Sequence, residues 1–118
     1  MSWIIKIPVV TPSLNEVRRQ HWAQVARRKA EMGWVLLGAI SKGPAIPRAS
    51  GARKLIIERH GKRDLDLDNL AGGAKSLIDC IKERGLIVDD APVSCELIFR
   101  QVLVGSETPH TIIYLEDI

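Results

Sequence analysis

The fold is decided by residues 53–90, which run RKLIIERHGKRDLDLDNLAGGAKSLIDCIKERGLIVDD. The apolar and β-branched residues of Arg53–His60 predict a strand, and Gly61-Lys62-Arg63 predicts a basic turn after it. From Leu70 onward, apolar residues recur at helical spacing, and Gly85 is a glycine of the kind that commonly ends a helix. The stretch therefore predicts a strand, an acidic segment and a helix, in that order.

The N-terminal segment adds one strand and one long helix. Ser2–Val10 is rich in Ile and Val and runs into a Thr-Pro turn, so we expect a strand there. Ser13 and Glu16 have the capping-box spacing, which predicts a helix start, and Gly43-Pro44 predicts its end. Residues 41–52, rich in Pro, Gly and Ser, predict a loop. One stripe of the helix is expected to be buried, namely Trp22, Val25, Ala26, Gly33, Leu36, Leu37 and Ile40.

The C-terminal segment predicts two strands, Ser94–Leu103 and Thr111–Leu115, paired across the turn at Gly105–Pro109. The element order is then β-α-β-α-β-β. This order predicts the α+β class, with a small mixed β-sheet covered by two helices. With 118 residues, of which 46% are apolar and 26% charged, the chain fits a single domain over residues 1–118.

Composition and spacing exclude several classes of protein. Cys80 and Cys95 are the only cysteines, and without a CxxC pair they predict neither a zinc site nor a disulfide framework. No apolar run approaches the roughly 18 residues that span a bilayer, so we expect no membrane segment and a cytoplasmic location. Gly72–Ser76 is similar to the end of a P-loop, but Asn69 and Ala74 occupy the two positions at which a P-loop needs glycine, so no nucleotide cofactor is expected. Asp64–Lys75 lacks the glycine and glutamate of an EF-hand calcium loop.

Charge is distributed unevenly along the chain. Residues 1–63 contain thirteen Lys and Arg against three Asp and Glu, whereas residues 64–118 contain four against eleven. A basic segment favours a polyanion such as DNA, and an acidic segment favours divalent cations. An ordinary solvated surface explains the asymmetry at least as well. The residues best suited to contact DNA phosphates lie in the expected long helix and are Arg18, Arg19, Arg27, Arg28 and Lys29.

The acidic segment carries the strongest chemical signal. If Asp64–Asp68 is extended, its three aspartates project from one face while Leu65 and Leu67 pack on the other. Like charges at this spacing are tolerated near solvent or around a hard divalent cation such as Mg²⁺. A solvated acidic edge strand would explain the run taken alone. Asp89-Asp90, at the end of an apolar run one helix later, favours convergence of the two acidic groups.

The order of these residues resembles that of the RusA-type Holliday-junction resolvases, especially their phage and prophage members. The residues similar to the central motif of that family are, in chain order, Asp66-Leu67-Asp68-Asn69-Leu70, Lys75 with Asp79, Gly85, and Asp89-Asp90-Ala91. Pro12-Ser13-Leu14-Asn15 is similar to the opening turn of the family. The resemblance therefore covers most of the chain and is weakest over residues 41–60.

The resemblance implies a homodimeric, Mg²⁺-dependent endonuclease that nicks opposing strands of a four-way DNA junction symmetrically, in recombination and repair. It implies metal binding by Asp66, Asp68 and Asp90, and a catalytic role for Lys75. Ala71-Gly72-Gly73 lengthens the interval before Lys75 relative to the best-known form of the motif. From the residues themselves, Asn69 is expected to cap the following helix rather than bind metal.

Two other interpretations remain open from the sequence. A non-catalytic protein with this fold that binds branched DNA would retain binding in EDTA and release no product in Mg²⁺. A small interaction module would depend on neither metal nor DNA. The intact set of aspartates favours the nuclease over both.

Overall fold

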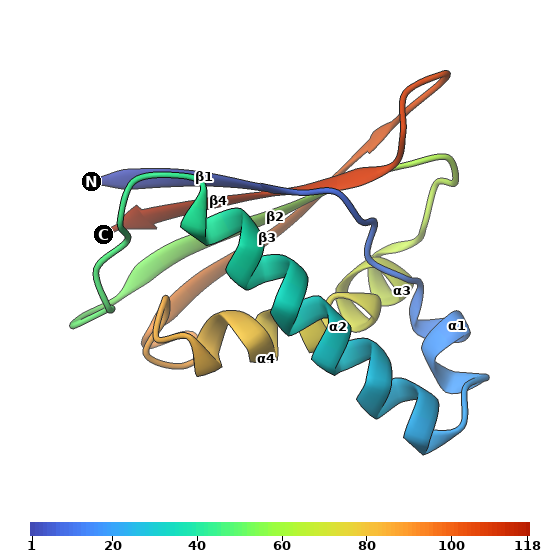
Figure 1. Cartoon of the computed structure of the whole chain (residues 1–118), viewed down its shortest axis with the longest axis horizontal. Helices are drawn as coiled ribbons and strands as arrows, with labels where there is room; N and C mark the ends of the chain where they lie inside the picture. The colour runs from blue at the N-terminus through green and yellow to red at the C-terminus, as the bar shows by residue number, and fades with distance from the viewer.

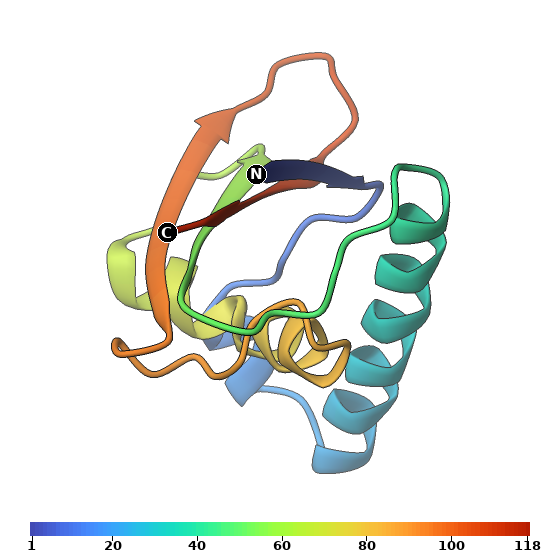
Figure 2. The same ribbon diagram turned by 90° about the vertical axis from the view of Figure 1, so that its left-hand side faces the viewer.

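A four-stranded mixed β-sheet carries the fold, and the helices lie on one face of it (Figure 1, Figure 2). The computed structural model describes residues 1–118. Its elements are, in chain order, β1 (Ser2–Ile7), α1 (Leu14–Arg18), α2 (Trp22–Ser41), β2 (Arg53–Gly61), α3 (Leu67–Gly73), α4 (Lys75–Glu83), β3 (Cys95–Leu103) and β4 (His110–Asp117). The predicted α+β class is confirmed, although each of the two expected helices is divided into two. None of these helices is both long and apolar enough to cross a lipid bilayer.

The strand order in the sheet is β1-β4-β2-β3. β4 pairs antiparallel with both β1 and β2, and β2 pairs parallel with β3. The expected pairing of the two C-terminal strands is therefore wrong, because β2 lies between them. β2 takes this central position because it buries Leu55 and Ile57 on one face and Ile56 on the other, whereas β3, at the edge, buries only Cys95.

The parallel pair of β2 and β3 needs a crossover connection, which α3 and α4 provide. α4 ends where the sequence predicts, in a Schellman motif. The Leu86 amide donates to the Ile81 carbonyl at 3.2 Å, and the Gly85 amide donates to the Lys82 carbonyl at 2.9 Å. Gly85 has a φ of 75°, a conformation that glycine adopts without the steric cost of a Cβ atom.

The long helix expected after Ser13 is interrupted. Ser13 caps α1 as predicted, and its hydroxyl accepts a hydrogen bond from the Glu16 amide at 3.1 Å. A second helix then begins after His21, whose Nδ1 accepts a hydrogen bond from the Ala23 amide at 3.2 Å. Leu36 is the only buried residue of the expected stripe. Trp22, which is 76% exposed, and Ala26 were also expected there but are exposed, because the first turns of α2 run away from the sheet (Figure 1).

The hydrophobic core lies between the sheet and the two helices α2 and α4. Ile57 and Ile113 reach it from the sheet, Leu36 from α2, and Ile81 from α4. Cys80 is buried in the same cluster, as predicted, and burial raises the pKa of its thiol. This packing holds α4, and with it Lys75, in a fixed place under the sheet.

Candidate active site

The acidic segment begins a helix and does not extend the strand. Asp66 is the N-cap of α3, and its carboxylate accepts hydrogen bonds from the Asn69 amide at 2.9 Å and from the Asn69 side chain at 3.2 Å. Asp68 lies in the first turn and is exposed, and Asp64 is exposed before the helix. The expected strand with three aspartates on one face is therefore wrong. A carboxylate at a helix N-terminus satisfies free amides and faces the positive end of the helix dipole.

Contrary to expectation, Asn69 does not cap its own helix but contacts α1. Its Oδ1 accepts a hydrogen bond from the Asn15 amide in α1 at 3.0 Å, while its own helix is capped by Asp66. The two glycines that lengthen the motif allow this close approach. A Cβ atom on Gly73 would lie 1.7 Å from the Pro12 carbonyl oxygen, and one on Gly72 would lie 2.8 Å from the Leu14 side chain. The opening turn of the chain is thus docked directly on the helix that carries Asp66 and Asp68.

Lys75 is the first residue of α4 and lies between two carboxylates. Its Nζ is 3.1 Å from Asp79 Oδ1, one helical turn later, and 3.4 Å from Asp90 Oδ2 in the segment that follows the helix. The hydrogen bond to Asp79 raises the pKa of Lys75, and Asp90 acts in the same direction, while partial burial opposes them. Lys75 is therefore a permanent cation at neutral pH, in contact with one of the predicted metal-binding aspartates.

A second ion pair lies beside this one. Lys82 Nζ is 2.9 Å from Asp89 Oδ1. That hydrogen bond, together with those from Asp90, lowers the pKa of Asp89. The two neighbouring aspartates therefore each have a lysine of α4 as a partner.

Lys82→Met is expected to raise the titration midpoint of Asp89. Because the pKa of Asp89 is lower in the folded chain than in the unfolded chain, the ion pair stabilises the fold above the unfolded pKa. This contribution is lost as pH falls through the depressed folded pKa. Carboxyl ¹³C shifts followed against pH measure the midpoint. Lys62→Met, at an exposed lysine without an ion pair, should leave it unchanged. An unshifted midpoint in Lys82→Met would contradict the assignment.

The aspartates expected to bind Mg²⁺ have suitable chemistry but do not form one cluster. Asp66 and Asp68 lie at the start of α3, whereas Asp90 lies against Lys75 at the start of α4. No three Asp, Glu, His or Cys side chains come together in a metal-binding arrangement within the chain. Carboxylate oxygens are the ligands that Mg²⁺ prefers. The residues therefore fit the ion by type, but the structure does not bring all three together in one site.

The predicted DNA-contacting residues fall into two groups. The first group is exposed and forms no ion pair, and its members are Arg18, Arg19, Arg27 and Arg28. Lys29 is different, because its Nζ is 2.9 Å from Glu83 Oε1 in α4. The exposed Trp22 lies beside the first group, with the His21 ring 5.3 Å away. The first group therefore leaves its charges available to an external anion, whereas Lys29 is already paired.

Arg59 is a buried cation that sequence analysis did not single out. It lies on the face of β2 that also carries Leu55 and Ile57, and its Nε donates to the Thr11 carbonyl at 2.9 Å. Gly61 leaves room for its guanidinium, since a Cβ atom there would lie 2.2 Å from Arg59 Nη1. The alternation of the strand was the available signal, because it already placed Arg59 on the apolar face.

Comparison with known proteins adds no further assignment. No protein-family model matches the chain, and no curated protein matches it.

Proposed function

We propose that this protein is a Mg²⁺-dependent endonuclease that resolves four-way DNA junctions by paired symmetric nicks, as its resemblance to RusA-type resolvases implies. The observation that carries the proposal is the contact between Lys75 and Asp90, 15 residues apart in sequence and 3.4 Å apart in space. Phosphodiester hydrolysis needs carboxylates for a metal and a fixed cation for the phosphate. The contact supports a single site in which Asp90 would contribute to metal binding and Lys75 would contact the phosphate.

Each residue has a distinct part in the proposed reaction. Asp66, Asp68 and Asp90 would hold Mg²⁺, which when bound supplies an activated water and neutralises charge on the phosphate. Lys75 provides a positive charge that is fixed by Asp79 and needs no proton transfer to act. Lys75 balances part of the charge of Asp90, and its ammonium group, held by Asp79, would contact a phosphate oxygen of the substrate.

The proposed assembly is a homodimer. Symmetric nicking of opposing strands needs two equivalent sites related by a two-fold axis. One chain offers one set of Asp66, Asp68, Asp90 and Lys75. A second copy on the other side of the junction would supply the second cut.

Arg27→Ala is expected to weaken junction binding and to lower the dependence of log Kd on log salt by about one unit. The reason is that Arg27 is exposed and has no partner in the chain, so its charge is available to a phosphate. Lys29→Ala is the matched comparison, and its effect should be smaller because Lys29 already pairs with Glu83. Titrations at several salt concentrations in EDTA measure both slopes. Equal slopes for the wild type and Arg27→Ala would remove Arg27 from the proposed interface.

A non-catalytic protein that binds branched DNA is the second candidate. It is favoured by one observation, the lack of a cluster of three metal-binding side chains within the chain. In this candidate, Asp66 and Asp90 serve as a helix cap and an ion-pair partner, the two roles they have in the single chain.

Cleavage of a synthetic four-way junction, compared with a linear duplex of the same sequence, distinguishes the two candidates. The nuclease should cut the junction in Mg²⁺, leave the duplex intact and lose all activity in EDTA. Lys75→Met should reduce the rate by about 100-fold, since a fixed charge at the phosphate contributes several kcal/mol. Lys82→Met, which removes a similar ion pair, is the matched control and should stay near the wild-type rate. Junction binding without cleavage would favour the second candidate.

A further inference from the structure

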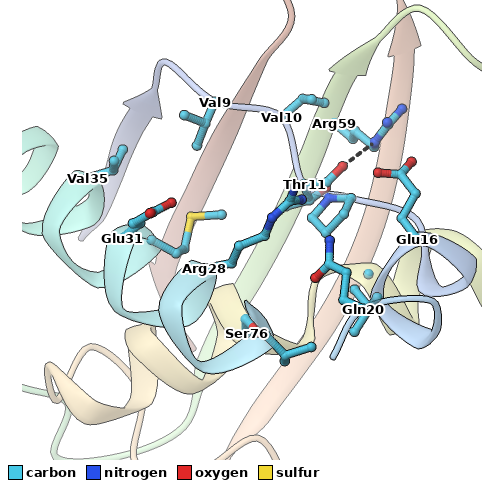
Figure 3. A pocket seen from close by; sticks show the side chains of 15 residues that line it. Val9, Val10, Thr11, Glu16, Gln20, Arg28, Glu31, Val35, Arg59 and Ser76 are labelled. Carbon is cyan, nitrogen blue, oxygen red and sulfur yellow. Dashed lines mark hydrogen bonds between the residues drawn. The ribbon is translucent and has the colours of Figure 1, made fainter. Parts of the chain in front are cut away.

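A pocket of about 430 Å³ lies between the segment after β1, the helices α1 and α2, and the junction of α3 with α4 (Figure 3). Its volume falls in the range of pockets that bind small molecules. Gly73 and Ser76 form part of its wall and flank Lys75 in the sequence. The pocket therefore adjoins the helix junction from which the proposed catalytic lysine projects.

Two polar residues that line this pocket are almost fully buried. Thr11 is 1% exposed, and its hydroxyl has no hydrogen-bond partner. Arg59 is 6% exposed and donates to the carbonyls of Thr11 and Arg63, at 2.9 and 3.3 Å, but forms no ion pair with a carboxylate. Burial lowers the pKa of Arg59, and the negative charge of Glu16 opposes this shift. The Thr11 hydroxyl is therefore an exception to the rule that buried polar groups are hydrogen-bonded, and Arg59 brings a buried cation to the pocket wall.

The side chains around the pocket balance one another in charge. Arg28 and Arg59 supply two positive charges, and Glu16 and Glu31 supply two negative charges. Figure 3 shows Glu16 near Arg59 on one side and Glu31 on the opposite side. A pocket with this balance does not suit a free phosphate. It suits an uncharged ligand that both donates and accepts hydrogen bonds.

The remaining wall is apolar. Val9, Met32 and Val35 line the pocket together with the polar groups, and Gln20 adds an amide that can donate and accept. Apolar walls with a few donors and acceptors are what a flat heterocyclic base needs when it leaves the base stack. Arginine pairs well with the acceptors of guanine, and glutamate with the amino group of cytosine.

We propose that this pocket accepts one unpaired nucleobase from the branch point and contributes to the sequence preference of cleavage. The proposal rests on the proposed function, since it requires branched DNA as the substrate. The base would be held next to the helix junction that carries Lys75, so that its identity influences which phosphate is cut. Arg28 and Glu31 would contact the base edge, and the exposed Arg27 would contact only the backbone.

A junction with 2-aminopurine at the branch nucleotides tests the proposal, because the fluorescence of this base rises when it leaves the stack. Binding is measured in EDTA, where no strand is cut. Gln20→Phe would fill the pocket, and Gln24→Phe, at an exposed residue of α2 outside the pocket, is the matched control. The wild type and Gln24→Phe should give the full rise, and Gln20→Phe should reduce it roughly fivefold.

A second readout does not depend on filling the pocket. Cleavage rates in Mg²⁺ on junctions that differ only in the branch base should vary for the wild type, and Glu31→Gln should change the preference by roughly tenfold. Undiminished fluorescence with Gln20→Phe and an unchanged preference with Glu31→Gln would overturn the pocket proposal while leaving the nuclease intact. If the wild type neither binds nor cuts junctions, the proposed function fails, and the pocket proposal fails with it.

Discussion

Asp68→Asn is expected to abolish junction cleavage and to leave junction binding intact. Asp68 is exposed in the first turn of α3 and makes no hydrogen bond or ion pair within the chain, so its substitution breaks no internal contact. Its loss removes a proposed metal ligand, and metal coordination contributes several kcal/mol to charge stabilisation in the transition state. The single-turnover cleavage rate in Mg²⁺ should fall by at least about 100-fold.

Asp64→Asn provides the matched control for this experiment. Asp64 is also exposed and lies four residues earlier, but it has no clear counterpart in the family motif. Its substitution removes the same charge and should leave the rate within a few-fold of the wild type. Equal losses in the two variants would point to a general electrostatic effect of the acidic segment. A nearly unchanged rate in Asp68→Asn would remove Asp68 from the active site.

Gly73→Ala is expected to lower the free energy of unfolding by about 2 kcal/mol or more. The added Cβ atom would lie 1.7 Å from the Pro12 carbonyl oxygen, which belongs to the backbone and cannot rotate away. Overpacking of this kind costs about 3 kcal/mol, and the higher helix propensity of alanine recovers about 1 kcal/mol. The melting temperature of a domain of this size should fall by roughly 8 °C.

Gly38→Ala separates the steric effect from helix propensity. Gly38 also lies in a helix, and a Cβ atom there would have no atom within 4 Å other than those of its neighbours and its own helix backbone. This variant should gain up to about 1 kcal/mol of stability. Thermal or urea unfolding of both variants measures the difference. If Gly73→Ala were as stable as Gly38→Ala, the opening turn would not be docked on α3 as described.

The sequence was sufficient for the class of fold and for most elements, but not for their pairing. Local periodicity located β2, and Gly85 located the end of α4. The neighbours of each strand depend on contacts between distant segments, and two consecutive strands near the C-terminus suggested a hairpin. The insertion of β2 between them follows from the burial of both its faces, which includes Ile56 on the side away from the helices.

The acidic segment shows why a short alternating pattern can mislead. Asp64–Asp68 alternates as a strand does, yet Asp66 is an equally good N-cap, and the helical spacing after Leu67 favours the cap. Asp66 and Asp68 are still close together, but as the N-cap and a first-turn residue of α3 and not as neighbours on one face of a strand. Their relation to Asp90 depends on the path of the segment after α4, for which the sequence has no local signal.

The residues of the candidate site were selected mainly through the family resemblance. That resemblance named Lys75 and Asp90 together, and the two are in contact through their side chains. The roles of Gly72 and Gly73 were not predictable, because they depend on the approach of Pro12 from the other end of the chain. Arg59 was overlooked because arginine in a strand is usually assigned to the solvent face, whereas this one lies on the core face.

The most direct test of the central claim is cleavage of one four-way junction, labelled in turn on each of its four strands, with Mg²⁺ and with EDTA. The account predicts nicks at symmetric positions on two opposing strands, formed together in Mg²⁺ and missing in EDTA. Such a result would establish both the hydrolysis and the paired action of two subunits. Tight binding of the junction with all four strands intact in Mg²⁺ would contradict the account and favour a protein that binds branched DNA without cutting it.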